Sequence, residues 1–142
     1  MKPEAGAMTT VLKRDVLPLK SEQDVVLARQ AVRKVAIEQG FGIVDQTKIV
    51  TAASELGRNT LIHGGGGEMV IETLLDGARR GVRATFTDRG KGIADIAKAL
   101  KDGFTTGSGM GLGLGGSKRL VDHFEIRSAP GEGTCITIAR WK

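Results

Sequence analysis

The spacing of apolar residues predicts a long amphipathic helix near the start of the chain. After Ser21, apolar residues recur every three or four positions as far as Gly40. They are Val25, Val26, Ala28, Val32, Val35 and Ala36. The hydroxyl of Ser21 can cap the first turn, with Asp24 at the third helical position, and Gly40 is typical of the residue just beyond a helix end.

The same periodicity predicts a second helix from about Asp45 to just before the glycines at 64–67. Its apolar stripe comprises Ile49, Ala52, Ala53, Leu56 and Thr60. Two further helices are expected, a short one over residues 93–101 and a longer one from about Leu112 to Asp122. Between them, residues 102–110 are expected to form an irregular loop.

Alternation of apolar and polar residues predicts the strands. They are expected at residues 9–17, 69–76, 81–88, 123–129 and 134–141. The order is a strand, two helices, two strands, two helices and two strands. Strand pairs joined by tight turns imply a mainly antiparallel mixed sheet with helices on one face, which is a two-layer α/β sandwich.

Composition favours a single soluble domain. The 142 residues suit one compact domain, with residues 1–8 expected as a flexible N-terminal segment. No stretch approaches the roughly 20 apolar residues of a membrane helix, and no secretory signal is recognisable. We therefore expect no membrane contact and a bacterial-type cytoplasmic location. The one cysteine, Cys135, excludes an internal disulfide and a multi-cysteine metal site.

The net charge of +5, from 21 basic and 16 acidic residues, favours an acidic ligand such as a nucleotide, or an acidic protein partner. Nucleic acid is the competing interpretation. Aromatic residues make up only 4% of the chain, however, and no zinc-finger or RNA-binding motif is present, so we expect no nucleic-acid partner. Arg79, Arg80 and Arg83 cluster at the first hairpin, where a solvated hairpin end is the simplest explanation.

Glycine is unusually frequent, with 21 residues concentrated at 64–67 and at 103–116. A flexible linker is the simplest explanation of such clusters. It fails for the second cluster, because Met110, Leu112 and Leu114 alternate with the glycines where a linker would carry polar residues.

Glu55 and Asn59 lie four residues apart on the second predicted helix and therefore share one face. The amide oxygen of Asn59 suits Mg²⁺, and a carboxylate one turn away can accept a proton from an attacking hydroxyl. The alternative is an ordinary surface pair, because this spacing is common on helices. His63 shares the face, where it fits a helix-end residue better than a catalyst.

Asp88 ends a predicted strand and is followed by Gly90 and Gly92. A carboxylate there can accept a hydrogen bond from an exocyclic amine such as adenine N6, and the glycines allow close approach to a flat ring. An ordinary turn is the alternative. Thr134, at the start of the last strand, can support Asp88 through its hydroxyl or a water, although a plain hairpin turn is equally consistent.

The second glycine cluster opens the last predicted helix. Its backbone N–H groups can surround phosphates, and Lys118 and Arg119 follow within two turns. The cluster also matches the dinucleotide-binding fingerprint, but no strand leads directly into it and no parallel βαβ unit surrounds it. A P-loop is excluded because the chain has no G-x-x-x-x-G-K-[ST].

The Glu55–Asn59 pair, the Asp88 segment and the second glycine cluster follow one another in the order of the conserved motifs, called boxes, of the GHKL ATP-binding (Bergerat) family. This family, which the chain resembles, includes gyrase B, Hsp90, histidine kinases and MutL. The matching residues are Glu55 and Asn59, then Asp88, Gly90 and Gly92, then Gly109, Gly111 and Gly113, with Thr134 as the final threonine. Residues 38–56, 54–67 and 102–126 are most similar to the RsbT-type serine/threonine switch kinases of bacterial anti-sigma and stressosome pathways. The resemblance covers roughly residues 9–142.

The resemblance implies an ATP- and Mg²⁺-dependent kinase that phosphorylates a serine or threonine of a STAS-domain partner. Once released, it would bind and activate a downstream phosphatase. Glu55 would be catalytic, Asn59 would hold Mg²⁺ and Asp88 would bind adenine. The remaining nucleotide contacts would come from Gly90, Gly92, Thr105, Thr106, Gly109, Met110, Gly111, Leu112, Gly113, Leu114, Lys118 and Thr134.

Two other functions fit the same residues. One is a nucleotide-gated binding module, either an anti-sigma factor or a phosphatase activator, in which ATP orders a lid that includes Phe104 and the two threonines after it. The other is an ATPase acting on a small molecule. The oligomeric state is left open.

Overall fold

The computed structural model describes residues 9–101 and 113–142. Its elements are β1 (Thr9–Leu19), α1 (Glu22–Glu38), α2 (Ile43–Ile62), β2 (Gly67–Asp76), β3 (Arg79–Asp88), α3 (Ile96–Ala99), α4 (Gly113–Arg119), β4 (His123–Ser128) and β5 (Thr134–Trp141). The five strands form one sheet in the order β1-β2-β3-β5-β4, and each neighbouring pair is antiparallel.

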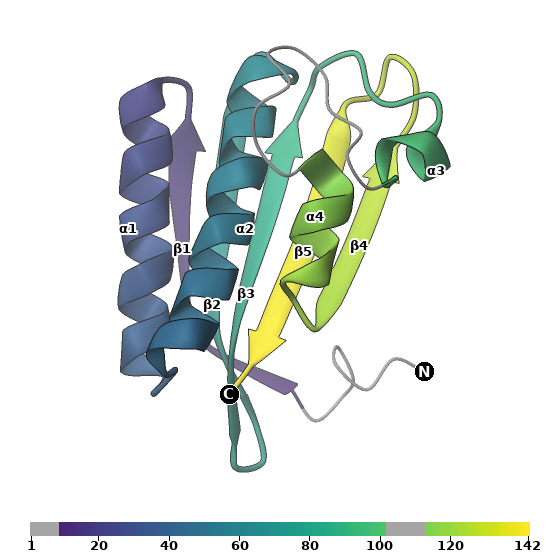
Figure 1. Cartoon of the computed structure of the whole chain (residues 1–142). Helices are drawn as coiled ribbons and strands as arrows, with labels where there is room; N and C mark the ends of the chain where they lie inside the picture. The colour runs from purple at the N-terminus through teal and green to yellow at the C-terminus, as the bar shows by residue number, and fades with distance from the viewer. Residues whose placement is uncertain (1–8, 102–112) are drawn as a thin grey trace.

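Helices α1, α2 and α4 cover one face of this sheet (Figure 1), which confirms the predicted α/β sandwich. The core lies between the two layers. Alternate residues of β3, namely Val82, Ala84 and Phe86, point into it and are almost fully buried, as are Ile136 and Ile138 opposite them on β5. This period of two is the pattern expected of a sheet with one buried face.

The start of α1 shows how local chemistry sets an element boundary. The hydroxyl of Ser21 accepts a hydrogen bond from the backbone N–H of Asp24 at 3.1 Å. The Asp24 carboxylate in turn accepts from the N–H of Lys20 at 2.9 Å. The predicted Ser21 cap is therefore confirmed. Gly40, just after the helix, has a φ of +84°, a conformation that favours glycine.

The last two helices are shorter than predicted. The carboxylate of Asp95 caps the N–H of Lys98 at 3.0 Å, so α3 begins at Ile96 rather than at residue 93. The predicted end of α4 at Asp122 is wrong, because the helix ends at Arg119. Asp122 instead donates its N–H to Ala139 O of β5 at 3.0 Å and accepts from Trp141 N at 2.7 Å.

Two predictions lie outside the described residues, namely the flexible segment 1–8 and the irregular loop at 102–110. In the described part of the chain, no helix has both the length and the apolar character needed to cross a membrane.

Candidate active site

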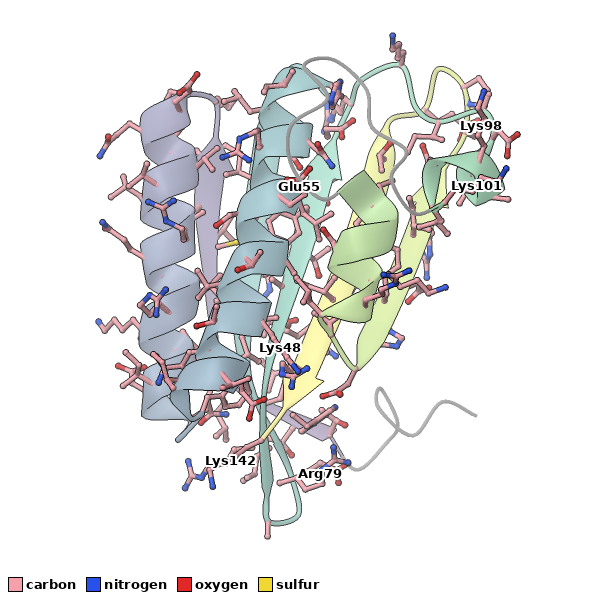
Figure 2. The ribbon with its side chains drawn as sticks, in the orientation of Figure 1. Lys48, Glu55, Arg79, Lys98, Lys101 and Lys142 are labelled. Atoms are coloured by element: carbon pink, nitrogen blue, oxygen red, sulfur yellow. The ribbon has the colours of Figure 1, made fainter. Side chains whose placement is uncertain are left out.

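Glu55 lies on the side of α2 that faces α4 and is only 7% exposed. One carboxylate oxygen, Oε2, accepts a hydrogen bond from the backbone N–H of Gly113, the first residue of α4, at 3.4 Å. The other, Oε1, lies 3.7 Å from Nη1 of Arg58. Figure 2 shows Glu55 between α2 and α4. A buried carboxylate needs such partners, and here they link α2 to the segment predicted to bind phosphates.

Asn59 follows Glu55 by one turn of α2 and is half-buried. Its backbone carbonyl closes the helix by accepting from the N–H groups of His63 at 2.9 Å and Gly64 at 3.1 Å. Among the described residues, no group of three His, Cys, Asp or Glu side chains is arranged to hold a metal. Mg²⁺ at Asn59 would therefore need nucleotide phosphates as its other ligands, which is the usual way proteins bind this ion.

Asp88 ends β3 with one carboxylate oxygen already engaged. Its Oδ1 accepts a hydrogen bond from the N–H of Gly90 at 2.8 Å. The backbone of Gly64, just after α2, packs so closely on the carboxyl group that a Cβ at Gly64 would overlap it. Gly90 packs on Gly64 in turn, and a Cβ on Gly90 would lie 2.8 Å from Cα of Gly64. Gly64 is therefore part of the candidate site, although the sequence pattern indicated only that a helix ends before it.

Gly92 and Gly133 close the other side of Asp88. Both have positive φ, +78° and +77°, and a Cβ on Gly92 would overlap the carbonyl oxygen of Ala129. A Cβ on Gly133 would overlap the carbonyl oxygen of Asp88. Glycine is required at both positions by the backbone angle and by the space. The wall around the predicted adenine-binding carboxylate consists mainly of backbone.

Thr134 lies directly opposite Asp88 in the β3–β5 pairing, so the two side chains leave the sheet on the same side. The Thr134 hydroxyl is 2.8 Å from Oγ of Ser128. Ser128 donates its single hydroxyl proton to Gly133 O at 2.9 Å and accepts from Ile93 N at 2.8 Å. Thr134 is therefore the donor in its pair with Ser128, and its own lone pairs stay available to accept a hydrogen bond. Support of Asp88 by Thr134 through a water remains a prediction.

Helix α4 carries three of the predicted nucleotide-binding residues, Gly113 and Leu114 at its start and Lys118 in its last turn. Gly113 has a φ of +71° and aims its N–H at Glu55. Leu114 is 8% exposed and packs in the core, which assigns it a structural role. Lys118 is exposed. The predicted residues Thr105, Thr106, Gly109, Met110, Gly111 and Leu112 lie outside the described part of the chain.

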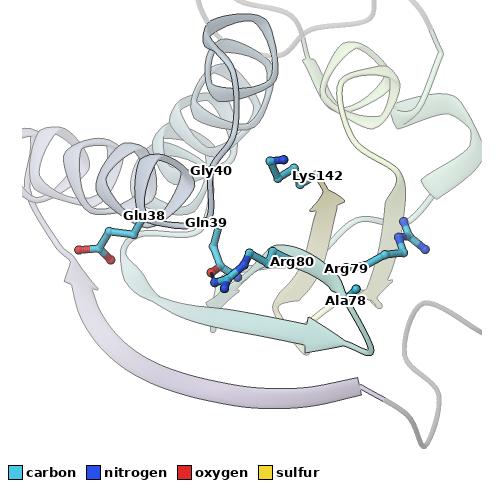
Figure 3. Close-up of a pocket in the computed structure, with 7 residues that line it drawn as sticks. All are labelled: Glu38, Gln39, Gly40, Ala78, Arg79, Arg80 and Lys142. Atoms are coloured by element: carbon cyan, nitrogen blue, oxygen red, sulfur yellow. Dashed lines mark hydrogen bonds between the residues drawn. The ribbon is translucent and has the colours of Figure 1, made fainter.

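A separate cavity of about 380 Å³ lies at the opposite end of the sheet from Asp88, beside the β2–β3 turn (Figure 3). Its lining includes Gln39, Arg80 and Lys142. Gln39 is 3% exposed, and its amide nitrogen donates to Leu74 O and Gly81 O, both at 2.8 Å. Its amide oxygen is 3.5 Å from Nη1 of Arg80. These contacts tie the end of α1 to the sheet and involve none of the predicted site residues.

Known proteins give an independent view of the chain. Residues 17–140 match the family model described as "Histidine kinase-like ATPase domain". The chain is 47% identical over 123 residues to the serine/threonine-protein kinase RsbT of Bacillus subtilis, covering 87% of this chain and 92% of the relative. It is 31% identical over 129 residues to the anti-sigma F factor of Thermoanaerobacter sp. (strain X514), covering 87% of this chain and 89% of the relative.

A solved structure shows the same fold. The crystal structure of the RsbU and RsbW domains of Rv1364c from Mycobacterium tuberculosis superposes with a TM-score of 0.59 at 25% identity. The match covers 90% of this chain and 31% of that longer chain. The resemblance found from the sequence motifs thus agrees with comparisons over nearly the whole chain.

Proposed function

Because the chain belongs to the histidine kinase-like ATPase family, we propose that it is an ATP- and Mg²⁺-dependent protein serine/threonine kinase. Its proposed substrate is a STAS-domain protein in a bacterial sigma-factor partner-switching pathway, and release from that partner would let it activate a downstream phosphatase. The observation that carries the proposal is the buried carboxylate of Glu55, one turn before Asn59 and bonded to the N–H of Gly113.

The adenine end of the site fits a nucleotide. Oδ1 of Asp88 is held by the N–H of Gly90, which leaves the second oxygen to accept from the exocyclic amine of adenine. Gly64 places no side chain against the carboxyl group, and Gly90 and Gly92 place none in the neighbouring turns, which suits the approach of a flat ring. Guanine carries a carbonyl oxygen at the corresponding position, and a carboxylate would repel it. Asp88 therefore accounts for selection of adenine.

At the proposed phosphate end of the site, the carboxylate of Glu55 lies beside the backbone N–H of Gly113. The proposed magnesium ligand is the amide oxygen of Asn59, and the ion would neutralise charge that develops on the phosphates. In the transfer step, the hydroxyl oxygen of the substrate forms a bond to the γ-phosphorus while the bond from that phosphorus to the β–γ bridging oxygen breaks. The hydroxyl proton passes to Glu55. A carboxylate is a much weaker base than an alkoxide, so Glu55 accepts the proton late in the step.

Transfer of label tests the proposal. The purified chain is incubated with [γ-³²P]ATP, Mg²⁺ and STAS-domain proteins of the source organism, each purified separately. We expect label on a serine or threonine of one of them. The rate of transfer by Glu55→Gln should be lower by about 100-fold or more. The matched control is Glu38→Gln, an exposed residue at the end of α1. Transfer by Glu55→Gln at the wild-type rate would rule out the catalytic role.

A second function is favoured by the relatives named anti-sigma F factor. In that case ATP would gate binding of a protein partner, and catalysis would not be essential. Nucleotide-dependent co-elution with a STAS-domain protein or a sigma factor, without transfer of label, would support this module over the kinase. Steady ATP turnover without any protein partner would instead indicate a small-molecule ATPase.

A further inference from the structure

Arg58 lies inside the Glu55-x-x-x-Asn59 box at a position to which the proposed reaction assigns no role. Its side chain is 53% exposed, and its Nη1 lies 3.7 Å from Oε1 of Glu55, whose side chain is only 9% exposed. We propose that Arg58 is a positioning residue that holds one oxygen of Glu55, so that the other oxygen faces the substrate hydroxyl. This inference rests on the proposed kinase function.

The two carboxylate oxygens of Glu55 have different partners. Oε2 accepts from the N–H of Gly113 and Oε1 faces Arg58. Gly113 belongs to the segment proposed to surround the phosphates. A phosphate that takes the Gly113 N–H leaves Oε2 without its donor. Among the described residues, Arg58 is the only cation in an ion pair with Glu55, so it would be the remaining restraint on the carboxylate.

The chemistry of arginine suits this restraint. A guanidinium stays charged at any working pH and has no acceptor, so Arg58 cannot take the proton itself. In the transfer step the proton moves from the substrate hydroxyl to Oε2, the new oxygen–phosphorus bond forms, and ADP leaves with the electrons of the broken bond. Arg58 stays ion-paired with Oε1 throughout. Its task is to fix the direction of Oε2, because small displacements of a reacting group lower rates strongly.

A purely structural role predicts something different. Ion pairs between helix residues three apart, with one partner half in solvent, add little to stability, and without nucleotide the Glu55 carboxylate keeps its hydrogen bond from Gly113 when Arg58 is removed. Removal of Arg58 should therefore leave the fold intact and alter only the step that depends on the direction of Glu55. Three measurements on Arg58 variants separate the two roles: the rate of phosphate transfer at saturating ATP, the affinity for nucleotide and the thermal stability. A positioning role changes only the first.

The test uses Arg58→Ala, Arg58→Lys and the control Arg33→Ala, an exposed arginine on α1. Transfer of label to a STAS-domain protein that the wild-type chain phosphorylates is measured in single turnovers at saturating ATP. We expect Arg58→Ala to lower the single-turnover rate constant about tenfold or more, with unchanged affinity for a fluorescent ADP analogue and little change in melting temperature. Arg58→Lys should recover most of the rate, because it restores a cation near Oε1.

A double-mutant cycle tests whether Arg58 acts through Glu55. Adding Arg58→Ala to Glu55→Gln should cause no further loss in the single-turnover rate. A further tenfold loss would overturn the inference, as would a wild-type rate for Arg58→Ala or a change confined to nucleotide affinity. If the wild-type chain labels no STAS-domain protein, the proposed function fails and the inference fails with it. If it labels one and Arg58→Ala labels it equally fast, only the inference fails.

Discussion

The backbone N–H of Gly113 lies 3.4 Å from Oε2 of Glu55, across 58 positions of sequence. This bond joins the proposed catalytic carboxylate to the segment proposed to bind phosphate. Both a carboxylate and a phosphate are strong acceptors for a backbone N–H. Nucleotide and Glu55 would therefore compete for the same donor, and their negative charges would repel each other.

We predict that Glu55→Gln binds ADP several-fold more tightly than the wild-type chain, although it transfers phosphate far more slowly. The substitution removes a buried negative charge close to the phosphates and weakens the hold on Gly113. Isothermal titration calorimetry with ADP and Mg²⁺ measures the change, and Glu38→Gln should leave the affinity unchanged. Weaker binding by Glu55→Gln would show that the carboxylate helps to hold the nucleotide.

Asp88→Asn should weaken ATP binding by roughly 10- to 100-fold, which corresponds to loss of one hydrogen bond to a charged acceptor. The amide oxygen of asparagine can still accept from the N–H of Gly90, so the turn should survive. The amide nitrogen would then meet the amine of adenine, donor against donor. Titration with ATP and GTP should show a smaller preference for ATP than in the wild-type chain, whereas Asp76→Asn on β2 should retain it.

Gly133 and Gly131 form a matched pair for testing the backbone wall around Asp88. Their φ angles are +77° and +80°, but a Cβ on Gly131 meets open space, whereas one on Gly133 overlaps Asp88 O. Gly131→Ala should cost about 1 kcal/mol of unfolding free energy from backbone strain alone. Gly133→Ala should cost about 3 kcal/mol or more. Urea unfolding measures both, and equal losses would contradict the close contact at Gly133.

Asp45, near the start of α2, makes stability depend on pH. A hydrogen bond from Arg140 at 2.6 Å, reinforced by the charges of Arg140 and Lys48, holds the pKa of Asp45 below its ordinary value. A lowered folded-state pKa contributes stability above the unfolded pKa of about 3.9, and this contribution is lost as the pH falls through the folded value.

Asp45→Asn should therefore reduce the free energy of unfolding at pH 7. The difference from the wild-type chain should shrink as the pH falls below the pKa of an unfolded aspartate. Urea titrations at pH 7 and pH 3 measure this difference. Asp15→Asn, on the exposed strand β1, serves as the control. A deficit for Asp45→Asn that stays constant down to pH 3 would show that the ion pair contributes nothing.

The features predicted correctly from the sequence depend on neighbouring residues. The Ser21 cap, the periodic stripes of the first two helices and the spacing of Glu55 and Asn59 all arise within a few turns. The error at the end of α4 involves a partner distant in sequence. Asp122 looked helical by its local pattern, but its backbone pairs with Ala139 on β5.

The same distinction applies to the site. Sequence motifs pointed to Glu55 and Asp88 as single residues. They did not predict that Gly64 packs on Asp88. Nor did they predict that the Ser128 hydroxyl contacts Ile93, Gly133 and Thr134. Gly64 and Asp88 lie 24 positions apart, and Ile93 and Ser128 lie 35 positions apart, so both contacts depend on how the sheet folds. A glycine followed by more glycines carries no local sign of the carboxylate that it will cover.

The glycine-lined surroundings of Asp88 have a consequence for chemical biology. A site can be enlarged for a bulkier nucleotide only by shortening a side chain that fills it. At Gly64, Gly90, Gly92 and Gly133 no side chain can be shortened, since each lacks a Cβ and packs against backbone or the Asp88 carboxyl group. A variant designed to accept an enlarged ATP analogue at the proposed adenine site would therefore need a change at a residue that has a side chain, such as Thr134, which pairs with Asp88 across β3 and β5.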